Sequence, residues 1–592
     1  MAQDLRKVLE QSWEHYKLNK IDPVTNRPLG DPDILGFGES GSQYFMTFSE
    51  TVSYVMFRSV WMNDQATFNR VWEWAYYNLW RKNIDEIFYW QISQWGEMPQ
   101  VRKDNLFAWR YVDNIKKKGR GGVIFFKWSD VEGALWRDGL DAAPDGDELI
   151  AASLALAHCL WGSQKGINDY LTHAKTITAD IWNKCVKYII PGVIDNFSSR
   201  PHLKSWFIYT TPSALLTRTL TAGPEKNTHA MEVNYFIPNT KWGGVGKELE
   251  KADFSEMHGL SFSCRGKQGD KLKVIFKGFQ KSNPNRETEA TTEVILTNDW
   301  QHHVLPFDKF KAEDKIDWTR IDALFLQADD NNQKGYFVIT DIKIYDGKLI
   351  GKENFHLTSN DKGEPWINLS YYMPFIYNTI FKKLDPSHPW EELAKNCYED
   401  ITTGANATLR DEDGKPHKGN GQLIPDWFSL TTTGKPTNVP WTNNLSTDDY
   451  MHGWDAFRFD FFAALDLAWN NEPLAKKYLM ETGPYEFYKN ELIKTGKINR
   501  GYAIDGKTMK GLRGTDEDGP GPYGCYLSLF KAAGDQQNAN KIMDNMMKTY
   551  NEQGYWGKNQ LEYYEQNWAW LGLAFSLDQG LHLKEALKKL DQ

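Results

Sequence analysis

The segment APDGDELIAASLALAHCLWG, residues 143–162, establishes the helical character of the chain. Its apolar residues recur at intervals of three and four, which places their side chains on one face of an α-helix: Ile150, Ala151, Leu154, Ala155, Ala157 and Leu160. The spacing predicts a helix that carries Asp145 at its start.

The same periodicity continues outward from this segment, but it is interrupted once. Helical spacing also occurs at residues 68–79, and we expect residues 1–190 to form helix hairpins joined by loops. Between 191 and 348 the sequence alternates and is broken by Gly, Asn and Asp turns, which is typical of strands: residues 271–276, 292–296 and 336–344. Helical spacing returns after 349, for instance at 390–398 and 457–469.

A helical, then β, then helical order indicates a sheet domain inserted into a helical domain. We therefore predict a mainly α fold with helical parts at 1–190 and 349–592 and an antiparallel β-sandwich at 191–348. The chain has 592 residues, more than a single hydrophobic core usually holds, and this length also favours two domains.

Composition excludes several classes of function. The formal net charge of -9 comes from mixed charges without a basic patch, which argues against a nucleic-acid partner and suits a neutral polymer. No run of about 18 apolar residues predicts a membrane span. Five widely spaced cysteines are typical of buried thiols rather than of a disulfide framework or a metal cluster.

The first residues, MAQDLRK, lack the apolar stretch of a signal peptide. We expect either a secreted or periplasmic protein whose signal peptide is missing from this sequence, or a cytoplasmic protein that acts on oligosaccharides. The oligomeric state is left open.

Three acidic residues stand at expected helix starts with aromatic residues close by: Glu50, Asp145 and Asp455. Enzymes that hydrolyse a glycosidic bond generally need two carboxyl groups, which face each other across the sugar. Aromatic residues make up 14% of the chain, and flat rings stack well on the apolar faces of sugars. The sequence thus predicts a carbohydrate-active protein.

Each acidic residue also has a purely structural interpretation. Thr47 with Glu50 fits a T-x-x-E capping box, and Asp145 with Glu148 fits the corresponding D-x-x-E pattern. Asp455 could simply pair with Arg458 one helical turn later. Periodicity alone does not decide between these interpretations and catalysis.

Several segments, in their order along the chain, resemble the motifs of glycoside hydrolase family 8. The matching segments are SETVSY (49–54), FNRVWEWA (68–75), APDGDE (143–148), AHCLWG (157–162), SYYMP (370–374), WDAFR (454–458) and YYEQNWAWLGLA (563–574). APDGDE and AHCLWG are similar to the xylan-active branch. The resemblance covers both helical parts and implies an (α/α)6 barrel of six helical hairpins, an acidic cleft at one end and hydrolysis with inversion. Thr51 and Val52 depart from the family's Gly-Met, and Val55 replaces a glycine.

Roles for individual residues follow from this resemblance. Glu50, desolvated by neighbouring aromatic residues, would stay protonated as the general acid, and Asp455 would be the general base that activates a water. Asp145 corresponds to the carboxylate that distorts the central sugar, while Tyr371 would hold the water and Arg458 would orient Asp455. The remaining substrate-binding candidates are aromatic: Trp128, Trp136, Trp454 and Tyr564. An aromatic residue at helical spacing is, however, more often part of a core.

We expect no metal and no cofactor. The 13 histidines show no H-E-x-x-H pattern, and the acidic turns at 411–414 and 516–519 lack the later glutamate of a calcium loop. The insert resembles jelly-roll carbohydrate-binding modules, through residues 300–307 and 337–345. It would either bind polysaccharide through exposed aromatic residues or only support the cleft.

The expected substrate is a β-1,4-xylan or its oligosaccharides. Exo-acting members that release xylose from the reducing end carry a Leu-His-Pro loop, where this chain has Pro520-Gly521-Pro522, so endo cleavage is favoured. Exo action, a β-glucan substrate and a non-catalytic polysaccharide-binding protein remain as alternatives.

Overall fold

The computed structural model describes residues 2–30, 46–83, 103–112, 141–189, 192–197, 203, 205–225, 228–239, 241–255, 257–329, 333–345, 354–361, 366–430, 436–439, 447–509, 514–558, 560 and 562–591. Its contacts divide the chain into two compact units. The helical unit comprises Met1–Lys187, Phe355–Ser429 and Trp441–Gln592, and the β unit comprises Tyr188–Asn354 and Leu430–Pro440. The sequence-based division assigned residues 430–440 to the helical part, whereas their contacts group them with the β unit.

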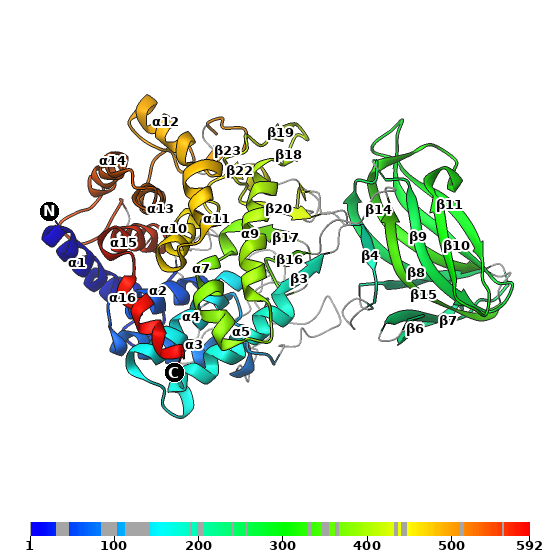
Figure 1. The fold of residues 1–592 in the computed structure, drawn as a ribbon, viewed down its shortest axis with the longest axis horizontal. Helices are drawn as coiled ribbons and strands as arrows, with labels where there is room; N and C mark the ends of the chain where they lie inside the picture. Colours follow the sequence, from blue (N-terminus) through cyan, green and yellow to red (C-terminus); the bar gives the residue numbers. More distant parts are fainter. Residues whose placement is uncertain are drawn as a thin grey trace, which may run out of the picture. The chain divides into compact units, whose positions relative to one another are not determined.

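The helical unit contains most of the helices of the chain (Figure 1). They are α1 (Ala2–Lys20), α2 (Ser49–Trp61), α3 (Gln65–Asn78), α4 (Pro144–Trp161), α5 (Tyr170–Cys185), α7 (Pro374–Ile376), α8 (Lys382–Leu384), α9 (Trp390–Ala405), α10 (Arg458–Asn470), α11 (Pro473–Lys477), α12 (Tyr485–Thr495), α13 (Pro520–Ala532), α14 (Gln536–Met547), α15 (Tyr563–Asp578) and α16 (Leu581–Ala586). A π-helical turn, Tyr377–Phe381, joins α7 to α8. None of the described helices has the length and apolar character needed to cross a bilayer.

Six helical segments contact one another in a closed ring. α2 packs on α4, α4 on the π-helical turn after α7, α7 on α10, α10 on α13, α13 on α15, and α15 on α2. A second set packs on the first: α3 on α2, α5 on α4, α9 on the π-helical turn, α11 on α10, α14 on α13, and α1 on α15. In Figure 1, α1 accordingly lies beside α15, at opposite ends of the colour scale.

The helices of the ring are buried on all sides, which explains their apolar or small residues all round. Every residue of α2 except Glu50 is buried. α13 and α15 approach so closely that a Cβ atom on Gly524 would lie 2.0 Å from the carbonyl oxygen of Trp568. Glycine is therefore required at this helix crossing.

Short strands border the helices. They are β1 (Met46–Phe48), β2 (Arg110–Val112), β3 (Val186–Ile189), β16 (Asn354–Leu357), β17 (Trp366–Asn368), β18 (Thr408–Arg410), β19 (Pro416–Lys418), β20 (Trp427–Leu430), β22 (Met451–His452) and β23 (Tyr502–Ala503). A further short strand, β21 (Pro436–Thr437), belongs to the segment that groups with the β unit. β1 pairs with β2, directly before α2, and β17 pairs with β20 through Asn368 opposite Trp427.

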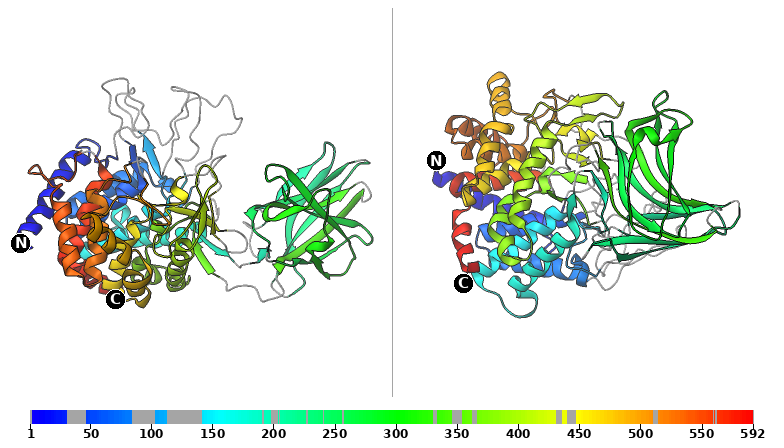
Figure 2. Two further views of the ribbon diagram at one scale, coloured as in Figure 1. Left: turned by 90° about the horizontal axis from the view of Figure 1, so that it is seen from above. Right: turned by 45° about the vertical axis from the view of Figure 1, so that its right-hand side comes forward.

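The β unit consists of two antiparallel sheets (Figure 2). Its strands are β4 (Val193–Asp195), β5 (Phe207–Thr210), β6 (Leu215–Ala222), β7 (His229–Phe236), β8 (Trp242–Ala252), β9 (Gly259–Gly266), β10 (Lys271–Gln280), β11 (Glu287–Ile295), β12 (Gln301–Pro306), β13 (Lys311–Ala312), β14 (Ile316–Asp329) and β15 (Lys334–Tyr345). The first sheet has the order β13-β11-β10-β14-β8-β5, and the second has the order β12-β9-β15-β7-β6 with β4 beside β15.

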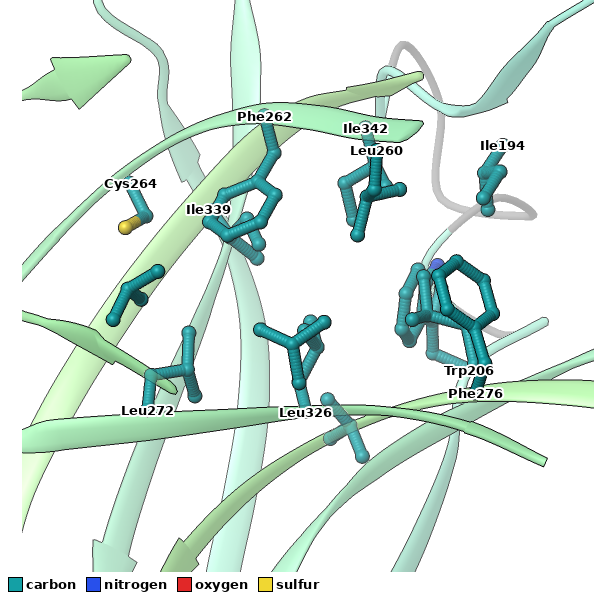
Figure 3. Packing of buried hydrophobic residues seen from close by; sticks show 14 of the residues in the cluster. Ile194, Trp206, Leu260, Phe262, Cys264, Leu272, Phe276, Leu326, Ile339 and Ile342 are labelled. Atoms are coloured by element: carbon teal, nitrogen blue, oxygen red, sulfur yellow. The ribbon is translucent and has the colours of Figure 1, made fainter. Parts of the chain in front are cut away.

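Alternating side chains of both sheets form one core. In β10, Leu272, Val274 and Phe276 are buried, and in β14 Leu324 and Leu326 are buried. Figure 3 shows Leu272 and Leu326 of the first sheet facing residues of β9 and β15 in the second, such as Phe262. This packing explains the period of two in the sequence of the insert.

Candidate active site

The predicted site residues lie where ring helices begin. Glu50 is the second residue of α2, Asp145 is the second residue of α4, and Arg458 is the first residue of α10. Tyr371 ends a 3-10 turn, Leu369–Tyr371, shortly before α7, and Tyr564 is the second residue of α15. The N-terminus of a helix carries partial positive charge, which favours carboxylates at these positions.

Arg458 joins the three acidic residues. Its Nη1 donates to Glu50 Oε1 and, over 3.2 Å, to Asp145 Oδ2, while its Nη2 donates to Asp455 Oδ1 over 2.6 Å. Nη2 also donates to Ser370 Oγ over 2.6 Å. Arg458 is only 3% exposed, so solvent screens these ion pairs weakly. One buried guanidinium thus gathers three carboxylates from distant parts of the sequence.

Glu50 accepts hydrogen bonds on both of its oxygens. Tyr54 Oη donates to Oε1 over 2.7 Å, and Tyr563 Oη donates to Oε2 over 2.7 Å. Phe48 packs nearby, with its ring centroid 6.0 Å from that of Tyr563. The Glu50 side chain is 16% exposed and is therefore accessible to a ligand from one side.

Asp145 is the most strongly buried of the three carboxyl groups, with a side chain that is 6% exposed. Its Oδ1 accepts from the backbone N–H of Gly146 over 2.8 Å. Burial, reinforced by the charge of Glu50 and opposed by Arg458, raises the pKa of Asp145 to about 7. Asp145 therefore holds a proton for part of the time near neutral pH.

Asp455 is the most open of the three, with 26% of its side chain exposed. Its Oδ2 accepts from Trp427 Nε1 over 2.9 Å, so that both carboxylate oxygens have a donor. The predicted ion pair with Arg458 is present, but the same guanidinium also serves Glu50 and Asp145. The local pairing interpretation is thus correct and incomplete.

The two capping interpretations are wrong. The N-cap of α2 is Phe48, and Thr47 Oγ1 donates to the carbonyl oxygen of Pro28 instead of capping the helix. The N-cap of α4 is Ala143, and Glu148 accepts from Tyr377 Oη over 2.8 Å. Neither pattern forms a capping box, although Asp145 does accept the N–H of Gly146 in the first turn of α4.

Close backbone packing brings Glu50 near Asp145. A Cβ atom on Gly146 would lie 2.5 Å from Ser49 Oγ and 2.8 Å from the carbonyl carbon of Ser49. The starts of α2 and α4 can touch in this way only because residue 146 has no side chain. Within the APDG sequence, Gly146 is therefore needed for close packing of the two helices, and Asp145 supplies a carboxyl group to the site.

Comparison with known families finds matches for two segments of the chain. Residues 99–196 match the family described as Glycosyl hydrolases family 8. The chain carries a family 8 glycosyl hydrolase domain. Residues 209–346 match Carbohydrate binding domain 30, which lies within the β unit. The family predicted from the motifs is confirmed.

The curated relatives match only part of this chain. Endoglucanase C of Ruminiclostridium cellulolyticum (strain ATCC 35319 / DSM 5812 / JCM 6584 / H10) is 28% identical over 152 residues, which are 25% of this chain and 27% of the relative. Endoglucanase 2 of Ruminiclostridium josui is 25% identical over 180 residues, 30% of this chain and 29% of the relative. The chain thus spans less than a third of the length of the curated relatives it matches.

Among solved structures, a GH8 catalytic-mutant xylanase from Teredinibacter turnerae in complex with xylohexaose is similar to this chain. It is 14% identical, the match covers 98% of this chain and 93% of the xylanase chain, and the TM-score is 0.43.

The aromatic candidates of the helical unit differ in their placement. The Tyr371 ring centroid lies 5.8 Å from the central guanidinium carbon of Arg458, and burial together with the charges of Asp145 and Asp455 raises the pKa of its hydroxyl well above the ordinary value. Trp454 and Tyr564 form a pair with ring centroids 6.1 Å apart. Trp128 and Trp136 lie outside the described residues, so their substrate contacts stay a prediction.

Five further residues of the helical unit complete the site: Tyr54, Ser370, Asp426, Trp427 and Tyr563. Tyr54, Ser370 and Tyr563 stand inside the segments that resemble the family, so their positions were available from the sequence. Asp426 and Trp427 belong to no such segment, and their contacts arise only when β20 pairs with β17. No group of three His, Cys, Asp or Glu side chains suited to a metal ion occurs among the described residues.

Proposed function

We propose that the family 8 domain hydrolyses β-1,4-xylosidic bonds in xylan or xylo-oligosaccharides with inversion, using Glu50 as general acid and Asp455 as general base. The observation that carries this proposal is the single guanidinium of Arg458, which binds Glu50, Asp145 and Asp455 together. Glycoside hydrolysis uses one carboxyl group as acid and a second as base. The cluster supplies both, and Glu50 is less exposed than Asp455.

The proposed inversion comes from the family resemblance and sets a requirement on the distance between Glu50 and Asp455. Inverting glycosidases keep their two carboxyl groups about 6.5–9.5 Å apart so that a water fits between the sugar and the base. Glu50 binds Nη1 of Arg458 and Asp455 binds Nη2, so the two carboxyl groups belong to one cluster and each has its own donor. Asp455, as the more exposed group, then deprotonates the attacking water.

Proton supply is a property of the whole cluster. Glu50 and Asp145 accept from the same Nη1 atom, so a proton on Asp145 lies close to the Glu50 side chain. With its pKa raised to about 7, Asp145 retains a proton for part of the time near neutrality. Glu50 delivers a proton to the leaving oxygen, and Asp145 hydrogen-bonds the central sugar more strongly as it approaches the transition state.

The arrangement of helices supports a barrel. The closed ring of α2, α4, α7, α10, α13 and α15, with a second layer of helices packed on it, fits the (α/α)6 barrel that the family resemblance implies. In such a barrel the loops before the ring helices line one end. Glu50, Asp145, Asp455 and Tyr564 all stand at or just before these helix starts.

The β unit supplies a second proposed function, binding of the glycan polymer. The outer face of its first sheet carries Phe207 and Tyr209 on β5, Trp242 on β8 and Phe325 on β14, with ring centroids 4.9–6.3 Å apart between neighbours. Gly244 and Gly246 of β8 lie opposite Tyr209 and Phe207 and leave room for these rings. Phe207 is 36% exposed and Trp242 is 41% exposed, so a sugar can stack there.

A substrate panel tests the proposed activity. Xylan, xylo-oligosaccharides, carboxymethyl cellulose, mixed-linkage β-glucan and chitosan are digested in parallel, and products are followed by chromatography and by NMR of the anomeric protons. We expect xylan products of several lengths from the start, which indicates endo action, with initial release of the inverted anomer. Xylose alone would indicate exo action, and products from glucan alone would replace xylan as the substrate.

Two variants make the test specific. Glu50→Ala and Asp455→Ala should each lose hydrolysis while they keep the native fold. A wild-type protein that binds glycans but releases no product would instead identify a polysaccharide-binding protein without catalysis.

A further inference from the structure

Asp426 and Trp427 stand directly before and at the start of β20, beside the turn that carries Asp455. Asp426 is 1% exposed, and its Oδ1 accepts three backbone N–H groups of that turn. The donors are Gly453 at 2.9 Å, Asp455 at 3.3 Å and Ala456 at 2.8 Å. Three amides of one turn that converge on a single buried oxygen fix the backbone from which the Asp455 side chain projects.

Trp427 acts on the side chain itself. Its Nε1 donates to Asp455 Oδ2 over 2.9 Å, while Arg458 Nη2 donates to Oδ1 over 2.6 Å. A carboxylate held at both oxygens cannot rotate freely about its terminal bond. The plane of the Asp455 carboxylate is therefore set by these two donors.

The same pair of strands also supports the predicted water-holding side of the site. The Trp427 ring packs edge-on against Tyr371, with centroids 5.8 Å apart. Asn368, opposite Trp427 on β17, accepts from the backbone N–H of Ser370 over 3.0 Å. The β17–β20 pair thus links Tyr371 and Asp455 in one rigid unit.

We propose that Asp426 and Trp427 are positioning residues for the general base, Asp426 through the backbone of the 453–456 turn and Trp427 through the carboxylate. This inference rests on the proposed function, in which Asp455 activates water. A base must aim a lone pair at the water, and a displacement of about 1 Å can cost on the order of 100-fold in rate.

Kinetics of three variants test this role. Asp426→Ala removes the acceptor of three amides and should lower kcat by about 100-fold with KM little changed. Asp426→Asn keeps an acceptor oxygen and should retain most of kcat, which separates positioning from charge. Trp427→Phe keeps a ring but removes the N–H donor, so kcat should fall by about tenfold and the acidic limb of the pH profile should move to higher pH.

A matched control accounts for the loss of an indole. Trp469 lies near the C-terminal end of α10 and donates its Nε1 to the carbonyl oxygen of Gln579 over 3.0 Å. Trp469→Phe also removes an indole N–H donor, but one near the opposite end of α10 from Arg458, and it should leave kcat and the pH profile unchanged. Equal effects of Trp427→Phe and Trp469→Phe would overturn the proposal for Trp427.

Hydrogen exchange gives a readout that does not depend on activity. In Asp426→Ala, the amides of Gly453, Asp455 and Ala456 should exchange faster than in the wild type, and Asp426→Asn should restore slow exchange. Unchanged exchange, or unchanged kcat in an active enzyme, overturns the role of Asp426. If the wild type hydrolyses no glycan, the proposed function fails, and the exchange data alone decide whether Asp426 holds the turn.

Discussion

Arg458 donates hydrogen bonds to three carboxylates at once, and its removal leaves these charges buried without a cation. Arg458→Met should therefore lower the free energy of unfolding at pH 7 by about 3–5 kcal/mol, the cost of breaking a buried ion pair. The loss should be smaller at pH 5, because carboxyl groups without a counter-charge take up protons. Urea unfolding at both pH values measures the difference.

A second buried arginine provides the control for Arg458. Arg58 lies on α2, donates to Asn567 over 2.9 Å and packs against the rings of Trp13, Tyr16 and Trp570. No ion pair of Arg58 with a carboxylate occurs within the described part of the chain. Arg58→Met should destabilise the protein equally at pH 5 and pH 7. If Arg458→Met shows the same pH independence, its contacts do not stabilise three ionised carboxylates.

Asp145 predicts a specific pH dependence of stability. Its pKa in the folded protein, about 7, is above the value of about 3.9 expected when the chain unfolds. Between these values the folded protein binds more protons than the unfolded chain, so stability falls as pH rises from about 4 to 7, by up to about 1.4 kcal/mol per pH unit for one proton. Above pH 7 this contribution is constant.

Asp145→Asn isolates that contribution from the other buried carboxyl groups. The difference in unfolding free energy between wild type and Asp145→Asn should change steadily between pH 4 and 7 and level off above pH 7. Guanidinium titrations at half-unit intervals of pH give this difference. A difference that is flat across the range would show that Asp145 does not titrate near neutrality.

At the scale of single residues, the sequence predicts contacts between near neighbours in the chain but not contacts between distant positions. The pairing of Asp455 with Arg458 could be predicted because the two residues are only three positions apart in the sequence, across the turn that leads into α10. The contact of Arg458 with Glu50, 408 positions away, depends on α2 and α10 beginning in the same region, which no local spacing encodes. The role of Asp426 could not be predicted for a different reason: its partners are backbone amides, which leave no pattern in the sequence.

Gly146 connects the site to the packing of whole elements. A Cβ atom at this position would collide with the Cβ, Oγ and carbonyl carbon of Ser49, so Gly146→Ala must move the start of α4 away from that of α2. We expect a loss of about 1–3 kcal/mol in stability, typical of overpacking, and a reduced kcat because Glu50 and Asp145 separate. Thermal unfolding and xylan hydrolysis measure the two effects.

Two companion variants sharpen this experiment. Ser49→Gly combined with Gly146→Ala removes two of the three colliding atoms and should restore part of the stability. Ser153→Ala changes a buried residue of α4 whose hydroxyl has no hydrogen-bond partner within the described residues, and it should have little effect. A fully active Gly146→Ala variant would mean that the α2–α4 contact does not position the carboxyl groups.

Elements with regular periodicity were predictable, and irregular ones were not. The 143–162 segment forms α4, and the alternation at 271–276 falls within β10, because burial on one face or two dictates the spacing of apolar residues. The short strands β17 and β20 have three and four residues, too few for a period to appear. Their pairing is fixed by tertiary contacts, so the support of Asp455 could not be foreseen.

The molecule as a whole combines a family 8 domain with a β unit that matches Carbohydrate binding domain 30, and the two proposed functions can be separated by mutation. Phe207→Ala with Tyr209→Ala removes two rings from the outer face of the first sheet. We expect binding to insoluble xylan to weaken by about 5-fold to 150-fold, because each of the two rings contributes roughly 0.5–1.5 kcal/mol. Hydrolysis of soluble xylohexaose should stay unchanged, since none of the candidate catalytic residues belongs to the β unit.

Exposed apolar area alone must be excluded as the cause of such binding. Ile295 on β11 is 62% exposed in the same sheet but has no aromatic ring, so Ile295→Ala should bind insoluble xylan like the wild type. Depletion from solution by washed xylan, with xylohexaose cleavage measured in parallel, compares all three proteins. Wild-type binding by the double variant would refute the aromatic face as the polymer site, whereas equal loss in Ile295→Ala would indicate nonspecific adsorption. Reduced cleavage of xylohexaose by the double variant would mean that the β unit also contributes to the hydrolytic site.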